Sequence, residues 1–340
     1  MTRVIQFPDR ESWLEGRRTM IGSSDVRAIF GQGYSGENKL SVYADKVATE
    51  PRRDPKALLK KFRAGHRAER LVLETYADEM EVEVHQHEEP TIYRHSELDF
   101  LGSTIDGWTF GETGKEVVEA KFIGHHAVHQ WKGVHPPLGH ALQVHMQLVC
   151  TNWHRAWLVG WTGEESFIFQ IDRHEQFRSF LLRELTAFWH DHVLARIPPT
   201  VDGSDASAEA IRRLFPVDDG AVIDLGESHG ELVSRLDRIK AREKKLEAMR
   251  KEAENRLRMA MGEASYGVLP DGRCVSLKLQ ERRGYFVEPT SFRKLYVHKS
   301  IPKEAGGMAR PKGRRAPNVA QPTTPSESEY RQWQQQTKNR

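Results

Sequence analysis

The order of the apolar runs between residues 60 and 195 constrains the fold of this chain more than any other feature of its sequence. Their periodicities indicate one helix, three strands, one helix, two strands and one helix. The runs span residues 60–80, 91–94, 100–110, 116–123, 137–151, 155–161, 166–171 and 175–194. Three consecutive strands indicate a meander, which the later strands would extend into a mixed sheet. The sequence therefore predicts an α/β (α+β) fold with a central mixed sheet flanked by helices.

A polar stretch over residues 198–208, with two prolines and a glycine, ends this alternating pattern. Such a stretch is typical of a boundary, so we expect a domain over 1–200 and a linker over 201–229. Residues 230–262 predict a long charged helix whose apolar residues follow 3/4 spacing, interrupted by Glu243 and Arg250. This spacing favours a helical hairpin arm or a short coiled coil.

A turn signal at Pro270-Asp271-Gly272 separates the β-prone runs 266–269 and 274–279. We therefore expect a C-terminal extension over 230–305 that consists of the long helix and a β-hairpin. From residue 306 to 340 the chain is rich in Gly, Pro, Ser, Gln, Lys and Arg and has little to bury. This composition predicts a disordered basic tail.

Composition excludes several classes of protein. The two cysteines, Cys150 and Cys274, are too few for a disulfide framework or for a cysteine-bound zinc or iron–sulfur site. Apolar runs are too short to cross a bilayer, and the first ten residues lack the apolar region of a signal peptide. We therefore expect no membrane association and a location in the reducing cytoplasm.

The net charge of +3 favours a polyanionic partner only weakly, but the positive charge is clustered. One cluster lies between residues 293 and 315, and the other consists of Arg52, Arg53, Lys56, Lys60, Lys61, Arg63, Arg67 and Arg70. Clusters of this kind can follow a phosphate backbone, and a solvated basic face is the equally weighted alternative.

Two acidic residues and a lysine form the strongest candidate for a chemical site. Glu119 and Lys121 are two residues apart on a predicted strand, so both side chains project from one face. If the preceding strand pairs through the turn at 111–115, Asp106 lies beside Glu119. Carboxylates are hard oxygen ligands that suit Mg²⁺ or Mn²⁺. Such a group can hydrolyse a phosphodiester, with Lys121 orienting the water or stabilising the developing charge.

Spacing alone favours a cross-strand surface salt bridge, which stabilises little. The apolar neighbours Val117 and Val118, together with Ile105 and Trp108, indicate a strand with a buried face. Charged groups in such a setting need a partner or a metal.

Several further motifs follow one another along the chain. They are Trp13 with Arg17, Ile21-Gly22-Ser23-Ser24-Asp25, Ile29-Phe30-Gly31, Tyr43 with Lys46, Gly65-His66-Arg67-Ala68-Glu69, Gly102-Ser103-Thr104-Ile105-Asp106-Gly107, Val118-Glu119-Ala120-Lys121, Trp131, Pro137 and Gln143-Val144. Over residues 10–195 this ordered set resembles the YqaJ-like viral recombinase family. That family includes phage lambda exonuclease and belongs to the PD-(D/E)XK nuclease superfamily, with its restriction-endonuclease-like core.

The resemblance assigns roles to matching positions. It implies that Asp106, Glu119 and the Ala120 carbonyl hold a first Mg²⁺, for which Mn²⁺ can substitute. It also implies that Glu69 completes the acidic site or binds a second metal, and that Gln143 helps Lys121 to orient the attacking water. Arg17 and Ser24 match positions that grip a 5′-terminal phosphate, for which the planar guanidinium is well suited.

Histidines offer an alternative metal site. His140 and His145 replace the tyrosine and second glutamine that are common in the family. They belong to a histidine-rich segment with His125, His126, His129 and His135. No His-Glu-x-x-His pattern or cysteine pair accompanies them, so zinc is the weaker hypothesis. Glu69 could instead lie on a solvated helix face, Gln143 could serve a core contact, and Ser24 with Asp25 could cap a helix.

Three functions are compatible with these residues. The resemblance implies a Mg²⁺-dependent exonuclease that degrades the 5′-ended strand of linear double-stranded DNA and leaves 3′ single-stranded tails. Its partners would be DNA ends, a single-strand annealing protein and other copies in a ring trimer, inside a bacterial cell that carries the phage or prophage. The alternatives are an endonuclease on the same core and a non-catalytic DNA-binding or assembly module.

Overall fold

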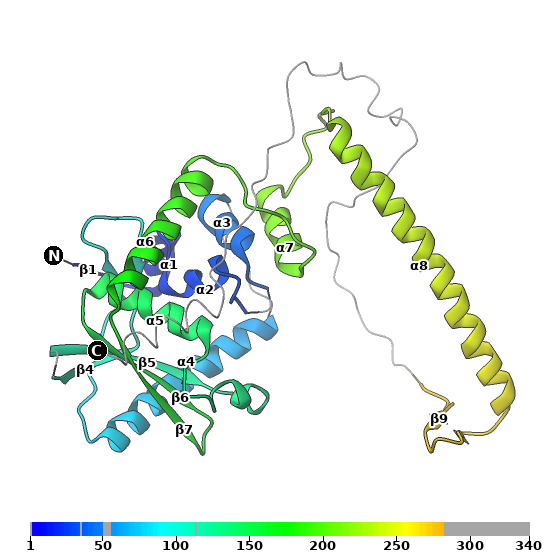
Figure 1. The fold of residues 1–340 in the computed structure, drawn as a ribbon, viewed down its shortest axis with the longest axis horizontal. Helices are drawn as coiled ribbons and strands as arrows, with labels where there is room; N and C mark the ends of the chain where they lie inside the picture. Colours follow the sequence, from blue (N-terminus) through cyan, green and yellow to red (C-terminus); the bar gives the residue numbers. More distant parts are fainter. Residues whose placement is uncertain (1, 35, 50–55, 113, 282–340) are drawn as a thin grey trace. The chain divides into compact units, whose positions relative to one another are not determined.

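The computed structural model describes residues 2–34, 36–49, 56–112 and 114–281, which form two compact units (Figure 1). The described part of the first unit ends at Pro216. Its elements are β1 (Arg3–Gln6), α1 (Arg10–Arg18), α2 (Ser23–Ile29), α3 (Lys39–Val47), α4 (Lys56–Met80), β2 (Thr91–Arg94), β3 (Gly102–Ser103), β4 (Gly107–Gly111), β5 (Gly114–Phe122), η1 (His125–Gln130), α5 (Leu138–Thr151), β6 (Arg155–Trp161), β7 (Ser166–Asp172), α6 (Glu175–Phe188), the π-helical turn η2 (Trp189–Leu194) and α7 (Asp205–Leu214).

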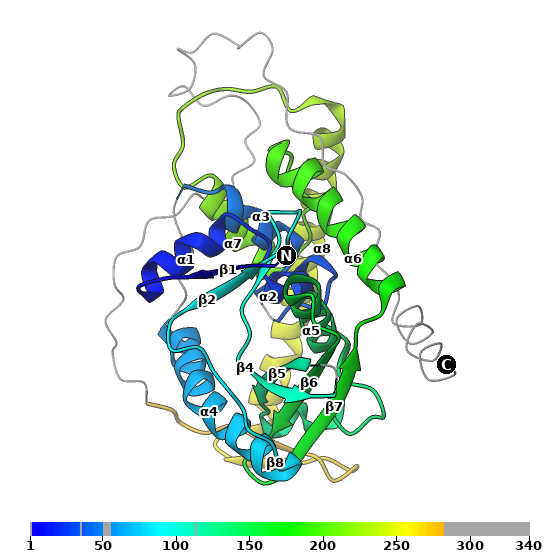
Figure 2. The ribbon, with the colours of Figure 1, turned by 90° about the vertical axis from the view of Figure 1, so that its left-hand side faces the viewer.

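A four-stranded mixed sheet forms the centre of this unit. Its order is β4-β5-β6-β7, in which only the pair of β5 and β6 is parallel. Helix α4 covers one face, where Val118 and Ala120 of β5 belong to the same buried cluster as Tyr76 (Figure 2). On the other face, Val117 belongs to the larger cluster that includes Leu142 of α5. The predicted mixed sheet flanked by helices is confirmed.

The predicted three-strand meander is wrong. Residues 100–110 do not form one strand, because β3 joins β1 and β2 in a separate antiparallel sheet while β4 joins the central sheet. The backbone of Gly102 bonds to Ile21, and Trp108 exchanges two backbone hydrogen bonds with His85. These distant partners draw the two halves of the run into different sheets, so periodicity within the run could not reveal the break.

The predicted linker over 201–229 is also wrong in part. Residues 205–214 form α7, whose N-terminus is capped by Ser204 and whose Ala206 and Ala210 are buried. Arg213 of α7 forms a salt bridge with Asp45 of α3 at 3.3 Å. The first unit therefore extends past residue 200. Alanine and serine bury little area per residue, so this stretch resembles a polar linker in the sequence.

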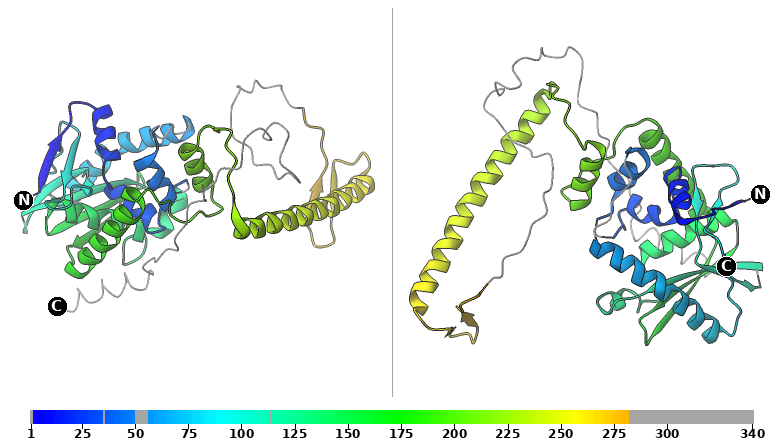
Figure 3. Two further views of the ribbon diagram at one scale, coloured as in Figure 1. Left: turned by 90° about the horizontal axis from the view of Figure 1, so that it is seen from above. Right: turned by 180° about the vertical axis from the view of Figure 1, so that it is seen from behind.

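The predicted extension of a long helix followed by a hairpin is present in the second unit (Figure 3). Helix α8 spans Gly226–Met261, and β8 (Tyr266–Val268) pairs antiparallel with β9 (Cys274–Ser276). None of the residues of α8 is buried. The predicted tail over 306–340 and the basic cluster between 293 and 315 lie outside the described residues. No helix in the described ranges combines the length and apolarity that a membrane span needs.

Two leucines on α4 provide a test of this packing. Leu73 is buried against the sheet, with 3% of its surface exposed, whereas Leu71 is 49% exposed. We expect Leu73→Ala to lower the free energy of unfolding by about 2–5 kcal/mol, because it leaves a cavity. Leu71→Ala should cost less than about 1 kcal/mol. Urea unfolding followed by tryptophan fluorescence measures both, and equal losses would contradict the assigned face of α4.

Candidate active site

Strand β5 directs the polar residues of the site to one face of the sheet. Because side chains alternate along a strand, Glu119 and Lys121 share a face with Val117, while Val118 and Ala120 face α4. Glu119 is only 1% exposed. The carboxylate is therefore buried, and it contacts polar side chains of α5.

The chain brings Asp106 to the same place. Gly107 pairs with Val118 across the β4–β5 ladder, so the residue before it lies next to Glu119. The backbone amide of Ala120 donates a hydrogen bond of 2.9 Å to the Asp106 carboxylate. Gly107 fits because a side chain there would lie about 3.0 Å from the His85 carbonyl oxygen. The three side chains predicted to form the site thus lie together.

Three side chains hold the Glu119 carboxylate. Lys121 and Gln143 both donate to its Oε1 atom, the latter at 2.6 Å, and Gln147 donates to Oε2. Gln143 and Gln147 are one turn apart on α5 and therefore face the same strand. Gln143, a predicted site residue, thus contacts the site directly.

Sequence reasoning missed Gln147, which is fully buried. Its Nε2 atom also donates to the Thr104 carbonyl at 3.1 Å, which ties α5 to the segment that leads to Asp106. Its Oε1 atom is buried without a hydrogen-bond partner among the described residues. The i+4 spacing from Gln143 was the signal that could have identified it.

Glu69 lies further from the other acidic residues. Its side chain on α4 is 30% exposed and contacts the His66 ring at 3.4 Å. It is near enough to raise the pKa of Asp106. Within the described ranges, however, no group of three or more His, Cys, Asp or Glu side chains is close enough to hold a metal ion. Glu69 therefore does not join Asp106 and Glu119 as a third ligand in this conformation.

The site is electrostatically strained. Burial, followed by the charges of Glu119 and Glu69, raises the pKa of Asp106 well above its ordinary value, against the opposing effect of Lys121. Burial would lower the pKa of Lys121, but Glu119 and Asp106 together raise it above its usual range. Lys121 is therefore charged at neutral pH. Its single ammonium group is the positive charge that the neighbouring carboxylates of Asp106 and Glu119 share.

This donor set fits a divalent cation. Asp106 and Glu119 supply hard oxygen atoms, and a cation between them would relieve the repulsion that raises the pKa of Asp106. The Ala120 carbonyl, the other predicted ligand, belongs to the residue whose amide already bonds to Asp106. The orphaned Gln147 oxygen provides a further polar group for a bound water.

A second cluster, also missed by sequence reasoning, adjoins Lys121. The buried Arg27 places its guanidinium 3.9 Å from the centre of the exposed Tyr34 ring and contacts Nδ1 of His140 at 3.0 Å. Burial, Arg27 and Lys121 lower the pKa of His140 well below its ordinary value, so this ring is neutral. The electrostatic influence of Tyr34 on Lys121 places this ring near the site as well.

The remaining histidines do not gather around one point. His145 packs against Phe177 at 4.6 Å between ring centres, and burial lowers its pKa to about 3. It therefore serves as a neutral core residue. His125, His126 and His129 are exposed on η1.

The two residues predicted to bind a 5′-phosphate are in contact. Arg17 donates to the Ser24 hydroxyl at 2.7 Å, and its guanidinium lies 4.8 Å from the centre of the Trp13 ring. A buried salt bridge of 2.8 Å between Lys46 and Asp25 supports the same corner. Helices α1, α2 and α3 thus hold Arg17 and Ser24 as one polar pair.

Positive charge continues along α4, where Arg63, Arg67 and Arg70 are exposed. Arg70 pairs with Glu74 at 2.7 Å. The remaining members of the first basic cluster lie outside the described residues or have side chains that the structure does not describe.

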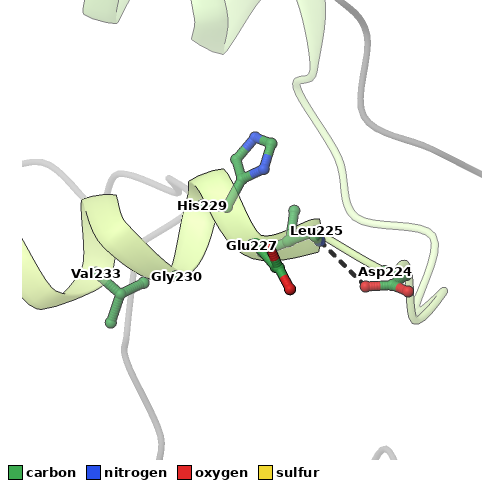
Figure 4. Close-up of a pocket in the computed structure, with 7 residues that line it drawn as sticks. Asp224, Leu225, Glu227, His229, Gly230 and Val233 are labelled. Carbon is green, nitrogen blue, oxygen red and sulfur yellow. Dashed lines mark hydrogen bonds between the residues drawn. The ribbon is translucent and has the colours of Figure 1, made fainter.

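A shallow concavity at the start of α8 contains none of these groups (Figure 4). Its lining includes Asp224, Glu227 and His229, and the Asp224 carboxylate accepts a hydrogen bond from the Gly226 amide at 3.1 Å. Asp224 and Glu227 are exposed and His229 is half-buried, so these side chains lack the burial that perturbs the groups around Glu119.

Known proteins are similar to this chain over a region that includes the residues of the site. Residues 12–154 match the YqaJ-like viral recombinase domain. The chain is 25% identical over 264 residues to the YqaJ protein of Bacillus subtilis, covering 76% of this chain and 81% of that protein. The alkaline exonuclease LHK-Exo of Laribacter hongkongensis is similar at a TM-score of 0.45 and 16% identity, over 55% of this chain and 94% of that chain. The structure of LHK-Exo in complex with dAMP is similar at a TM-score of 0.46 and 18% identity, over the same shares of the two chains.

The raised pKa of Asp106 leads to a prediction about stability. The folded protein binds this proton more tightly than the unfolded chain, where the pKa of aspartate is about 3.9, so stability falls as pH rises above about 4. Each tenfold difference in proton affinity corresponds to about 1.4 kcal/mol. We therefore expect Asp106→Asn to raise the free energy of unfolding of the metal-free protein at pH 8, with no gain at pH 3.

Urea unfolding in EDTA at both pH values measures this difference. Asp78→Asn, on the exposed surface of α4, provides the matched control and should change little. Equal or lower stability of Asp106→Asn at pH 8 would show that the carboxylates around Glu119 do not repel each other.

Proposed function

We propose that this chain, which belongs to the YqaJ-like viral recombinase family through its residues 12–154, is a metal-dependent nuclease that hydrolyses the ends of double-stranded DNA. The observation that carries the proposal is the meeting of Asp106, Glu119 and Lys121, of which Glu119 is buried and the other two are half-buried. Two carboxylates beside a charged lysine match the needs of phosphodiester hydrolysis, which are a metal site and a cation to stabilise the developing charge.

Asp106, Glu119 and the Ala120 carbonyl would hold Mg²⁺, or Mn²⁺ in its place. The bound cation supplies a polarised phosphoryl oxygen and a water of lowered pKa. Lys121 stays protonated because its pKa is raised, so it donates hydrogen bonds and positive charge and does not act as a general base. Gln143 and Gln147 fix the orientation of Glu119 through its two oxygen atoms.

We further propose digestion from the 5′ end, which would leave 3′ single-stranded tails for a single-strand annealing protein. Support comes from Arg17 and Ser24, whose contact creates a pair of donors suited to a terminal phosphate. The ring trimer implied by the family resemblance would keep such an enzyme on its DNA. A location in the cytoplasm of a bacterial cell that carries the phage or prophage accords with this role.

Removing the charged groups of the site should abolish hydrolysis. We expect Asp106→Ala and Lys121→Ala each to lower the rate at least about 100-fold, since each removes a group that contacts the reacting phosphate or its metal. Lys115→Ala, at the exposed start of the same strand, should remain active. The assay follows Mg²⁺-dependent release of nucleotides from linear duplex, with DNA affinity measured separately.

Substrate topology separates this function from its alternatives. An exonuclease leaves a covalently closed circle intact, whereas an endonuclease cuts it. Full activity of Lys121→Ala would refute the catalytic assignment. A wild-type protein that binds DNA without cutting it under any divalent ion would instead indicate a binding module.

The polar pair on α1 and α2 predicts a dependence on the 5′-phosphate. We expect Arg17→Ala to slow digestion of 5′-phosphorylated ends at least about tenfold, because it removes a bidentate donor, and to slow hydroxyl ends much less. Arg10→Ala is the matched control, since Arg10 lies on the same helix and near the same Trp13 ring, at 5.6 Å. An equal loss on both kinds of end would remove the phosphate role of Arg17.

A further inference from the structure

Within the second unit, helix α8 carries a line of apolar side chains that no described residue of that unit covers. Leu232 is 60% exposed, Leu246 is 64% exposed and Ile239 is 42% exposed. Leu257, near the end of the helix, belongs to the same line and is 46% exposed. Exposed leucines along a single helix carry a cost in water that association would remove.

These residues follow a heptad repeat of constant register, in which positions a and d face a partner helix. Position d is occupied by Leu232, Ile239, Leu246, Ala253 and Ala260, and position a by Leu236, Glu243, Arg250 and Leu257. The repeat spans about four heptads, or roughly 42 Å of helix at 1.5 Å per residue. The two charged residues are therefore members of the repeat and do not shift its register.

The charges at position a decide the orientation of a partner. A parallel copy would place Glu243 against Glu243, and Arg250 against Arg250. An antiparallel copy can instead pair Leu232 with the partner's Leu257, and Leu236 with the partner's Ala253. In that register Glu243 lies one layer from the partner's Arg250, and the twofold axis creates this opposite-charge contact twice.

Both charged residues are available for such contacts. Glu243 forms no ion pair within the described ranges, and Arg250 pairs with Glu254 at 3.2 Å on the helix surface. That Arg250–Glu254 pair is 65% and 38% exposed, so exchanging it costs little. Helix α8 thus carries both an acidic and a basic residue, Glu243 and Arg250, that can pair with their counterparts on a second copy.

We propose that α8 forms an antiparallel two-stranded coiled coil with α8 of a second copy of this chain. Leucine and isoleucine at a and d supply the buried area, and the Glu243–Arg250 contacts select the orientation. The interface uses residues outside the candidate active site, so it is independent of nuclease activity and would join two nuclease units.

Disulfide trapping tests the partner and the orientation in the full chain. In a Cys274→Ser background, which removes the exposed native thiol, we expect Leu232→Cys and Leu257→Cys to form a covalent dimer only when mixed or combined. Each single variant should remain unlinked on a non-reducing gel. Linking of a single variant would show a parallel pair, and no linking in any sample would show that a second copy does not cover this face. Either result overturns the proposal.

Charge reversal provides a second test by sedimentation equilibrium. Glu243→Arg creates two like-charge contacts in the antiparallel dimer, so we expect association through α8 to weaken about tenfold. Adding Arg250→Glu should restore it. Glu231→Arg, an equal reversal at a solvent-facing position of the same helix, is the control. Failure of the double variant to recover would contradict the antiparallel register.

Discussion

The burial of the Glu119 carboxylate between β5 and α5 is the interaction on which the rest of the site depends. A charge in an apolar setting costs several kcal/mol unless it is paired and hydrogen-bonded. Here Lys121 comes from the same strand, while Gln143 and Gln147 come from the helix above it. These contacts therefore fix the position of α5 on the sheet as well as the orientation of the carboxylate.

In the same arrangement the carboxylates of Asp106 and Glu119 repel each other. Asp106 ends the irregular segment between β3 and β4 and lies against Glu119, where burial and that neighbour raise its pKa. The pair of carboxylates therefore opposes folding of the metal-free protein at neutral pH. Perturbed acidic groups of this kind are typical of sites that bind cations and perform chemistry.

The two units differ in the burial of their apolar side chains. In the first unit both faces of the central sheet are covered by helices of the same chain, and the large side chains that α4 and α5 turn toward the sheet are buried. In α8 most of the large apolar residues of the heptad repeat remain exposed. A long helix with this pattern requires a surface of matching periodicity, which a second copy of the same helix provides.

Local patterns in the sequence were sufficient for α4, α5, α6 and α8, for most strands and for the common face of Glu119 and Lys121, because periodicity of 3.6 or 2 residues is a local property. The break between β3 and β4 was not predictable, since it depends on hydrogen bonds to Ile21 and His85, which are distant in sequence. Helix α7 was missed for a related reason: its small residues become a helical face only through burial in the first unit, beside α3.

The sequence by itself determined which chemical groups are present and on which side of a strand or helix they project. Only the tertiary structure decided which of those groups meet. It brought Gln147 to Glu119 and Arg27 to His140, and it left Glu69 outside the acidic pair. The physical reason is that side-chain direction follows from local backbone geometry, whereas contact between elements depends on packing that minimises the exposed apolar surface of the whole unit.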